Sequence, residues 1–264
     1  MDVLNYESQF LDERVRESLR CIYNTNGHNC SPWVRPQHIY GRRAVLDAGD
    51  GWKPVCSVDD DPAYPETNSI DVITSDGEGN DQTIEIRGMT IDEDGFTPVT
   101  QTAVLNGVED VTLATPLARV LALRCISDST PGGTVVVKDS AAGVEHLSIV
   151  GNINQSQKCA WTTAKNEYLL IKQMGCTATN SGGAAHYTKF SLQWQNMPEG
   201  LVIVRHSPYV VLTQQLPYIN MDIDPILIIP PNNDVRVLTK TTADGCEIGA
   251  WLNGVLATIE SSGE

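Results

Sequence analysis

Residues able to do acid–base chemistry are scattered through this chain of 264 residues. The five histidines stand at positions 28, 38, 146, 186 and 206. The last three fall on or beside strand-like runs, where an exposed or hydrogen-bonded side chain is more typical than a general base. The chain has no serine nucleophile elbow, phosphate loop, dinucleotide loop or zinc-protease helix. We therefore expect no catalytic residue, no cofactor and no enzymatic activity.

Two groups of residues carry donor atoms for a metal ion. Sulfur and imidazole donors come at a spacing that fits no zinc pattern, at Cys21, His28, Cys30 and His38. Oxygen donors alternate with glycine as in part of a calcium loop, at Asp76, Glu78 and Asn80 and again within residues 91–95. The bidentate glutamate that closes an EF-hand is missing, so ordinary acidic turns are the preferred interpretation. No metal ligand is assigned, and calcium binding by these loops stays open.

Seven cysteines, an odd number without close pairing, favour folding in a reducing cytoplasm over a disulfide framework. Cys125 and Cys246 lie in strand-like runs, where cysteine usually acts as a small buried hydrophobe. The first residues lack the basic and apolar regions of a secretory signal.

Acidic residues outnumber basic ones by 33 to 18, which gives a formal net charge of −15. Phosphate contacts need clustered Lys and Arg, so we expect no nucleic acid partner. A surface of this charge also repels anionic surfaces. No apolar run approaches about 18 residues, so we expect no membrane span.

The stretch from Gln82 to Val150 organises the chain. Its apolar runs are short, several alternate apolar with polar residues, and Asn, Gly, Asp or Pro separates them. This pattern indicates half-buried antiparallel strands joined by tight turns. Ile84 and Ile86 should therefore face one way while the residues between and beside them face the other. Asn106-Gly107 is the strongest hairpin signal, because both residues tolerate the positive φ of a type I′ turn.

Further strand-like runs follow, many spaced by roughly 8–12 residues, as in sandwiches and barrels. The continuous apolar run Ile226–Ile229 predicts a strand covered on both faces. Asp244-Gly245 and Asn253-Gly254 predict two more turns. The fold class predicted is all-β: an antiparallel, jelly-roll-like β-sandwich with an N-terminal helix and an extended arm.

The first part of the chain has a different character. Glu7 to Tyr23 predicts an amphipathic helix with one apolar stripe, which packs either on the chain's own sheet or on another subunit. Residues 28–81 are rich in proline and short of periodic apolar runs, which predicts an extended arm. We therefore divide the chain into a docking arm, residues 1–81, and a sandwich domain, residues 82–264. The candidate interaction residues are the helix stripe and two tryptophans: Leu11, Val15, Leu19, Ile22, Trp33 and Trp52.

Several turn and strand motifs fall in two stretches, residues 84–137 and 228–256. They are Ile86–Met89, Val104–Gly107, Val111–Leu113, Arg119-Val120, Gly132–Val135 and Ile229–Val237. In this combination the chain resembles the structural proteins of tailed bacteriophage virions, of the marine and cyanobacterial type. Where that family has a Pro-x-Gly turn in its middle, this chain has Thr163–Asn166. Since the shared positions are turn and core residues, the resemblance implies a building block without a catalytic site.

The function predicted is a non-enzymatic virion structural protein on the capsid or tail, made in the host cytoplasm. Its expected partners are further copies of itself, as a homo-oligomer, and other virion proteins. One alternative is a receptor- or glycan-binding tail fibre module, whose partner is a host surface glycan. A second is a glycosidase-like hydrolase on a sandwich, which needs two carboxyl groups facing each other across a cleft.

Overall fold

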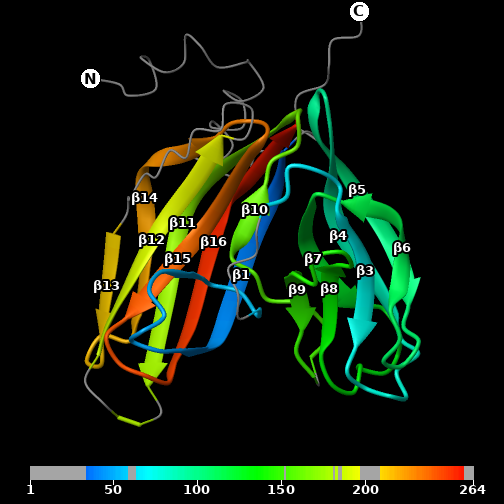
Figure 1. The fold of residues 1–264 in the computed structure, drawn as a ribbon. Coiled ribbons are helices and arrows are strands. Elements are labelled where there is room, and N and C mark those ends of the chain that lie inside the picture. Colours follow the sequence, from blue (N-terminus) through cyan, green and yellow to red (C-terminus); the bar gives the residue numbers. More distant parts are fainter. Residues whose placement is uncertain are drawn as a thin grey trace, which may run out of the picture.

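The computed structural model describes residues 34–58, 64–151, 153–180, 182–183, 186–196 and 209–258, and in these ranges every regular element is a β-strand. The strands form four antiparallel sheets, which pack in pairs as two sandwiches lying side by side (Figure 1). The all-β, antiparallel prediction is confirmed. The predicted N-terminal helix lies outside the described residues.

The first sandwich is built from both ends of the described chain. One sheet has the order β1-β16-β11-β14, and the other has the order β10-β15-β12-β13 with β2 also paired to β15. A single apolar core lies between the two sheets and takes residues from both. The strands are β1 (Val34–Leu46), β2 (Lys53–Pro54), β10 (Ala160–Thr162), β11 (Glu167–Asn180), β12 (Tyr187–Asn196), β13 (Tyr209–Thr213), β14 (Tyr218–Ile229), β15 (Asn233–Thr241) and β16 (Cys246–Thr258).

Strand pairing in the first sandwich follows the order of one long hairpin that has been rolled up. The first strand pairs with the last, β1 with β16, and the next pair inward is β2 and β10 with β15. Then β11 pairs with β14, and β12 with β13. The pairs β1–β16 and β11–β14 therefore lie in one sheet, and the pairs made by β15 and by β12 with β13 lie in the other.

The second sandwich is made from the middle of the chain. Its sheets have the orders β6-β3-β8-β9 and β5-β4-β7, and they share a second apolar core. The strands are β3 (Ile70–Ser75), β4 (Thr83–Asp92), β5 (Gly95–Val104), β6 (Val111–Leu117), β7 (Arg119–Cys125), β8 (Val135–Asp139) and β9 (Glu145–Ile149).

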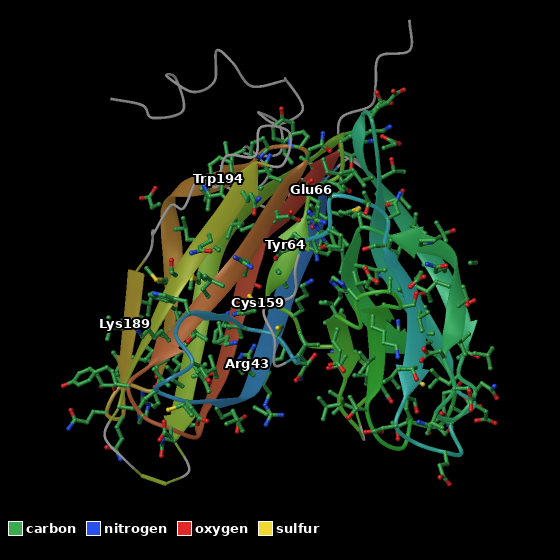
Figure 2. The ribbon with its side chains drawn as sticks, in the orientation of Figure 1. Arg43, Tyr64, Glu66, Cys159, Lys189 and Trp194 are labelled. Atoms are coloured by element: carbon green, nitrogen blue, oxygen red, sulfur yellow. The ribbon has the colours of Figure 1, made fainter. Side chains whose placement is uncertain are left out.

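The second sandwich is inserted into the first between β2 and β10, two short strands that both pair with β15. The chain leaves the first sandwich after β2 and returns just before β10, and Cys56 forms an antiparallel bridge with Lys158. The amide of Cys159 donates to the carbonyl of Val55 at 2.8 Å. Arg43, buried beneath this point, donates to the carbonyls of Pro54 and Val58 (Figure 2). The two ends of the inserted segment are thus held side by side.

Alternation in the organising stretch is confirmed at β4. Ile84 and Ile86 are fully buried in the second core, while Arg87 is exposed. The apolar run at the end of β14 is also covered on both faces, as predicted. Ile229 lies in the first core, and Ile226 lies in a separate apolar cluster on the opposite face of the sheet.

The division drawn after residue 81 does not coincide with the two sandwiches. β1 and β2 fall within the predicted arm, yet they pair with β16 and β15. β3 also falls within it and pairs with β6 and β8. Prolines in this part of the chain obscured its alternation, but proline is tolerated in edge strands such as β1 and in short pieces such as β2.

One turn prediction changes in detail, and another is wrong. At Asn106-Gly107 the turn has Gly107 and Val108 at its centre, and only Gly107 has a positive φ, of 60°. The strands on either side, β5 and β6, belong to opposite sheets rather than to one hairpin. Asn253-Gly254 makes no turn, because β16 runs straight through it, whereas Gly245 has a φ of 68° and turns the chain between β15 and β16, as predicted.

The cysteines in the described ranges behave as predicted. Cys125 and Cys246 are buried, and so are the three others, at positions 56, 159 and 176; all five are free thiols. None of the described elements is a helix long and apolar enough to cross a membrane.

Candidate functional site

The residues with the most chemistry meet where the two sandwiches join. Arg119 on β7 and Asp234 on β15 form an ion pair across this junction, with both side chains 2% exposed. Nε of Arg119 lies 3.1 and 3.2 Å from the two carboxylate oxygens, and Nη2 lies 2.9 Å from Oδ2. A charge removed from water to this extent needs a paired and fully hydrogen-bonded environment.

Arg119 has that environment. Its Nη1 donates to the carbonyls of Pro65 and Ala118, each at 2.7 Å. The guanidinium carbon also lies 4.8 Å from the ring centroids of Tyr64 and Phe96, within range of cation–π contact. Figure 2 shows Tyr64 at the boundary between the two sandwiches. The planar, five-donor guanidinium satisfies groups from both sandwiches at once.

The loop before β15 completes the junction. Asp234 accepts a hydrogen bond from Oγ1 of Thr162, at 2.5 Å. Asn232 has a φ of 58°, a conformation that asparagine tolerates better than most residues, and its side-chain oxygen accepts the amide of Phe96 at 2.9 Å. Gly95 packs against the same asparagine side chain and has a φ of 119°, so that a side chain would not fit there.

Lys158 lies beside this network. Its amine donates to the carbonyl of Val120 at 3.0 Å and lies 5.9 Å from the ring centroid of Tyr64. Burial of the amine lowers the pKa of Lys158 from 10.5 to about 8, against the opposing effects of Cys56 and Asp234. Arg119 and Arg236 add smaller contributions in the same direction as burial.

A cleft of about 610 Å³ opens next to the junction, between β1 of the first sandwich and β4, β5 and β7 of the second. Glu167 is the single carboxylate among the described residues that line it, and Arg35 pairs with it at 2.5 Å. Trp161 lines the cleft with a buried indole N–H that has no acceptor among the described residues. The facing pair of carboxylates that a glycosidase needs is therefore not found along this part of the cleft.

Thiol chemistry is disfavoured by burial in the first core. Burial raises the pKa of both Cys159 and Cys176 well above the ordinary thiol value. The thiolate is the reactive form, so these two groups act as small apolar side chains.

The acidic loops are held by protein donors. Asp76 accepts the amide of Thr134, and Asn80 exchanges hydrogen bonds with the backbone of Gly132. In the second loop Oδ1 of Asp92 accepts the amides of Asp94 and Gly95. Lys165 of the first sandwich lies 3.7 Å from Asp92 and 3.4 Å from Asp94. No group of three or more metal-donor side chains is found among the residues described.

One of the predicted interaction residues can be placed. Trp52 lies in the loop between β1 and β2 and is 37% exposed. The other five lie outside the described residues: Leu11, Val15, Leu19, Ile22 and Trp33. Sequence reasoning noted Arg119 and Asp234 as motif positions but gave them no role. The available signal was a single charged residue inside an otherwise apolar run, as at Leu117–Leu123.

No family model matches the chain, and no curated protein matches it. Among solved structures, the chain has weak similarity to the infectious bursal disease virus Gt strain, with 11% identity and a TM-score of 0.21. It is similar to the VP2 subviral particle of the same virus at 8% identity and a TM-score of 0.21. Each match covers 94% of this chain and 78% of the other. Likeness at this level carries no argument, so function is inferred below from the chain's own residues.

Proposed function

We propose that this protein is a non-enzymatic structural component of a bacteriophage virion, a building block of the capsid or tail. The observation that carries the proposal is the pairing order in the first sandwich. β2 and β10 both pair with β15, so we count them as one strand, which gives eight strands in the first sandwich. The first of these strands pairs with the last, the second with the last but one, and so on inward, with successive pairs in opposite sheets. This is the strand order of an eight-stranded jelly roll. Viral capsid domains are among the main users of that architecture.

The positions of the virion-like motifs support the same proposal. Arg119 comes from the first resembling stretch, while Asn232 and Asp234 come from the second. In three dimensions they meet in the buried junction, where Arg119 pairs with Asp234 and Asn232 accepts from Phe96. Motif residues that fix two sandwiches to each other suit a building block, because subunits that repeat in an assembly need one constant shape.

Assembly is part of the proposal. Identical chains in a virion bind one another through repeated, symmetric contacts. We propose homo-oligomers docked on other virion proteins, with the segment before β1 and its stripe of Leu11, Val15, Leu19 and Ile22 as the docking element. β1, β2 and β3 are sheet strands, so the test is deletion of residues 1–30 rather than of the whole predicted arm. Unchanged mass by light scattering and unchanged incorporation into particles would show that this segment does not dock.

The virion assignment is tested on purified particles. Quantitative mass spectrometry should find the protein at a copy number that is a multiple of a symmetry order of the capsid or tail. Antibody labelling in the electron microscope then distinguishes a capsid position from a tail position. Absence of the protein from particles that still infect, or its removal by a mild salt wash, contradicts the proposal.

A further inference from the structure

The sheet β1-β16-β11-β14 has an outer face, turned away from the first core, that differs from an ordinary polar surface. On β16 the inward residues are Ile248, Ala250 and Leu252, all buried in that core. The outward residues between and beyond them, Trp251 and Asn253, are partly exposed. Strand registers place the outward residues of the four strands in rows across this face.

Aromatic side chains from three strands gather on this face. Tyr40 on β1 lies opposite Trp251, and Trp251 lies opposite Gly175 on β11. A Cβ atom built on Gly175 would lie 2.0 Å from the indole ring, so the ring covers the backbone of the neighbouring strand. Tyr218 of β14 lies one row further along, opposite Thr177, and its ring stacks diagonally with that of Trp251, with 5.6 Å between ring centroids and 29° between planes. Tyr40 is 38% exposed and Tyr218 52% exposed, so both ends of this aromatic group are open to solvent.

The next row is a chain of polar side chains. Nδ1 of His38 lies 2.5 Å from Oδ1 of Asn253, and Nδ2 of Asn253 donates to Oε1 of Gln173 at 2.8 Å. Nε2 of Gln173 then donates to Oδ1 of Asp222 at 3.3 Å. These four residues cross β1, β16, β11 and β14 in order, one row away from Tyr40 and Trp251. Amide and carboxylate groups aligned by one another retain further donor and acceptor positions on their exposed side.

A sugar ring has the matching chemistry. Its C–H groups form an apolar face that packs on an aromatic ring, and its hydroxyl groups lie at the edge, where they donate and accept hydrogen bonds. Three strand spacings separate His38 from Asp222 at the two ends of the polar row, roughly 14 Å in all. This length suits a short oligosaccharide rather than a single sugar.

Charge selects among sugars. Arg42 and Glu247, also on this sheet, form an ion pair at 2.8 Å, so their charges cancel. Asp222 is exposed at one end of the polar row. The chain as a whole carries a formal charge of −15. Sialylated or sulfated glycans would be repelled by this field, whereas a neutral glycan would not.

We propose that the outer face of β1-β16-β11-β14 binds a neutral oligosaccharide. Sugar rings stack on Tyr218 and Trp251, and their hydroxyl groups bind the chain formed by Asn253, Gln173 and Asp222. The inference goes beyond the building-block function and stands on this face alone, so that either can fail without the other.

The test uses the full chain and a panel of oligosaccharides. The neutral probes are cellohexaose, laminarihexaose, mannohexaose and chitohexaose, and the anionic probes are sialyllactose and a heparin-derived hexasaccharide. Binding is measured by isothermal titration calorimetry and by tryptophan fluorescence. We expect at least one neutral probe to bind, and Tyr218→Ala to weaken it about tenfold, equivalent to about 1.4 kcal/mol. Gln173→Ala should weaken the same probe.

The matched control is Tyr187→Ala. Tyr187 is 58% exposed but lies on β12, in the opposite sheet, so its removal should leave glycan binding unchanged. Circular dichroism and thermal melts establish that each variant is folded, and both tyrosines are exposed enough for this to be expected. Binding of anionic probes alone, no binding at all, or equal effects of the two tyrosine variants overturns the proposal. A dimer of the full chain that Tyr218→Ala dissociates also overturns it, because the face would then be a contact between copies.

Discussion

At the scale of single residues, the role of Arg119 depends on groups that are distant in sequence. Its carboxylate partner is 115 residues away, and one of its carbonyl acceptors, Pro65, is 54 residues away. The arginine brings these segments together inside the protein, where a guanidinium without partners would be strongly unfavourable. Its contribution is therefore specific to the native arrangement of the two sandwiches.

Arg119→Met should strongly destabilise the protein. The substitution leaves Asp234 buried without its counter-charge, and breaking a buried pair in this way costs about 3–5 kcal/mol. Urea denaturation followed by tryptophan fluorescence measures the loss. Adding Asp234→Asn to the same chain should recover part of it, because no unpaired charge then remains in the junction.

The matched control for that prediction is Arg42→Met. Arg42 also pairs with a carboxylate, that of Glu247, but the two side chains are 43% and 50% exposed. Exposed pairs contribute about 0–1 kcal/mol. Equal losses of stability from Arg42→Met and Arg119→Met would show that burial of the junction pair has no energetic role.

Lys158 should make stability depend on pH in a defined window. Burial lowers its pKa in the folded protein to about 8, below the ordinary 10.5, so between these values the unfolded chain binds more protons. Stability from this group therefore rises as pH increases from about 8 to 10.5, by at most about 3 kcal/mol. Urea denaturation across this range should show that rise in the wild type relative to Lys158→Met. Parallel pH profiles for the two proteins would rule the effect out.

At the scale of elements, β11 departs from regular pairing where it meets β16. β11 has an extra residue between Ile171 and Gln173, and Gly254 of β16 lies opposite this bulge. A Cβ atom at Gly254 would lie 2.0 Å from the carbonyl oxygen of Leu170. Glycine is therefore needed here for close approach of two backbones in a continuous sheet, and not for a turn.

Gly254→Val should disturb the pairing of β16 with β11. The neighbour is backbone and cannot rotate away, so the strands must separate, at a cost of about 1–3 kcal/mol by comparison with overpacked cores. The measurement is the shift in urea midpoint, together with hydrogen exchange at the amides of β11. Gly49→Ala is the control, since nothing lies within 4 Å of a Cβ atom there. A midpoint shift no larger than that of Gly49→Ala would contradict the close-approach argument.

At the scale of the whole molecule, one sandwich is inserted into another at a point where its two ends are paired. Cys56 and Lys158 face each other across an antiparallel bridge, and each sandwich has a core of its own. Domains inserted at such closely spaced ends can be tolerated without disrupting the host fold. We therefore expect the first sandwich to fold without the inserted sandwich, but not without its own strands.

Replacing residues 58–156 by an Asn-Gly turn should leave a folded all-β protein. Asp234→Asn belongs in the same variant, because removal of Arg119 would otherwise leave a buried charge unpaired. Circular dichroism and light scattering should report a folded, smaller species with lower stability than the full chain. Deleting residues 34–46 instead removes β1 from its sheet and should prevent folding. An unfolded excision variant would show that the two sandwiches fold only as one unit.

The sequence by itself determined the secondary structure class and much of the local pattern. Alternation fixed the buried face of β4, and the uninterrupted apolar run predicted the doubly covered end of β14. Asp244-Gly245 marked a turn that is present. These properties depend on residues close together in the chain, so local periodicity and turn chemistry are sufficient to predict them.

Only the tertiary structure decided which strands share a sheet and which charges meet. β1 pairs with β16 across more than two hundred residues, and proline in that segment had favoured an arm. The Asn253-Gly254 pair resembles a turn locally, yet it lies in the middle of β16, paired with β1 on one side and β11 on the other. Arg119 and Asp234, or Tyr40, Trp251 and Tyr218, become neighbours through strand order and register, which a one-dimensional pattern does not contain.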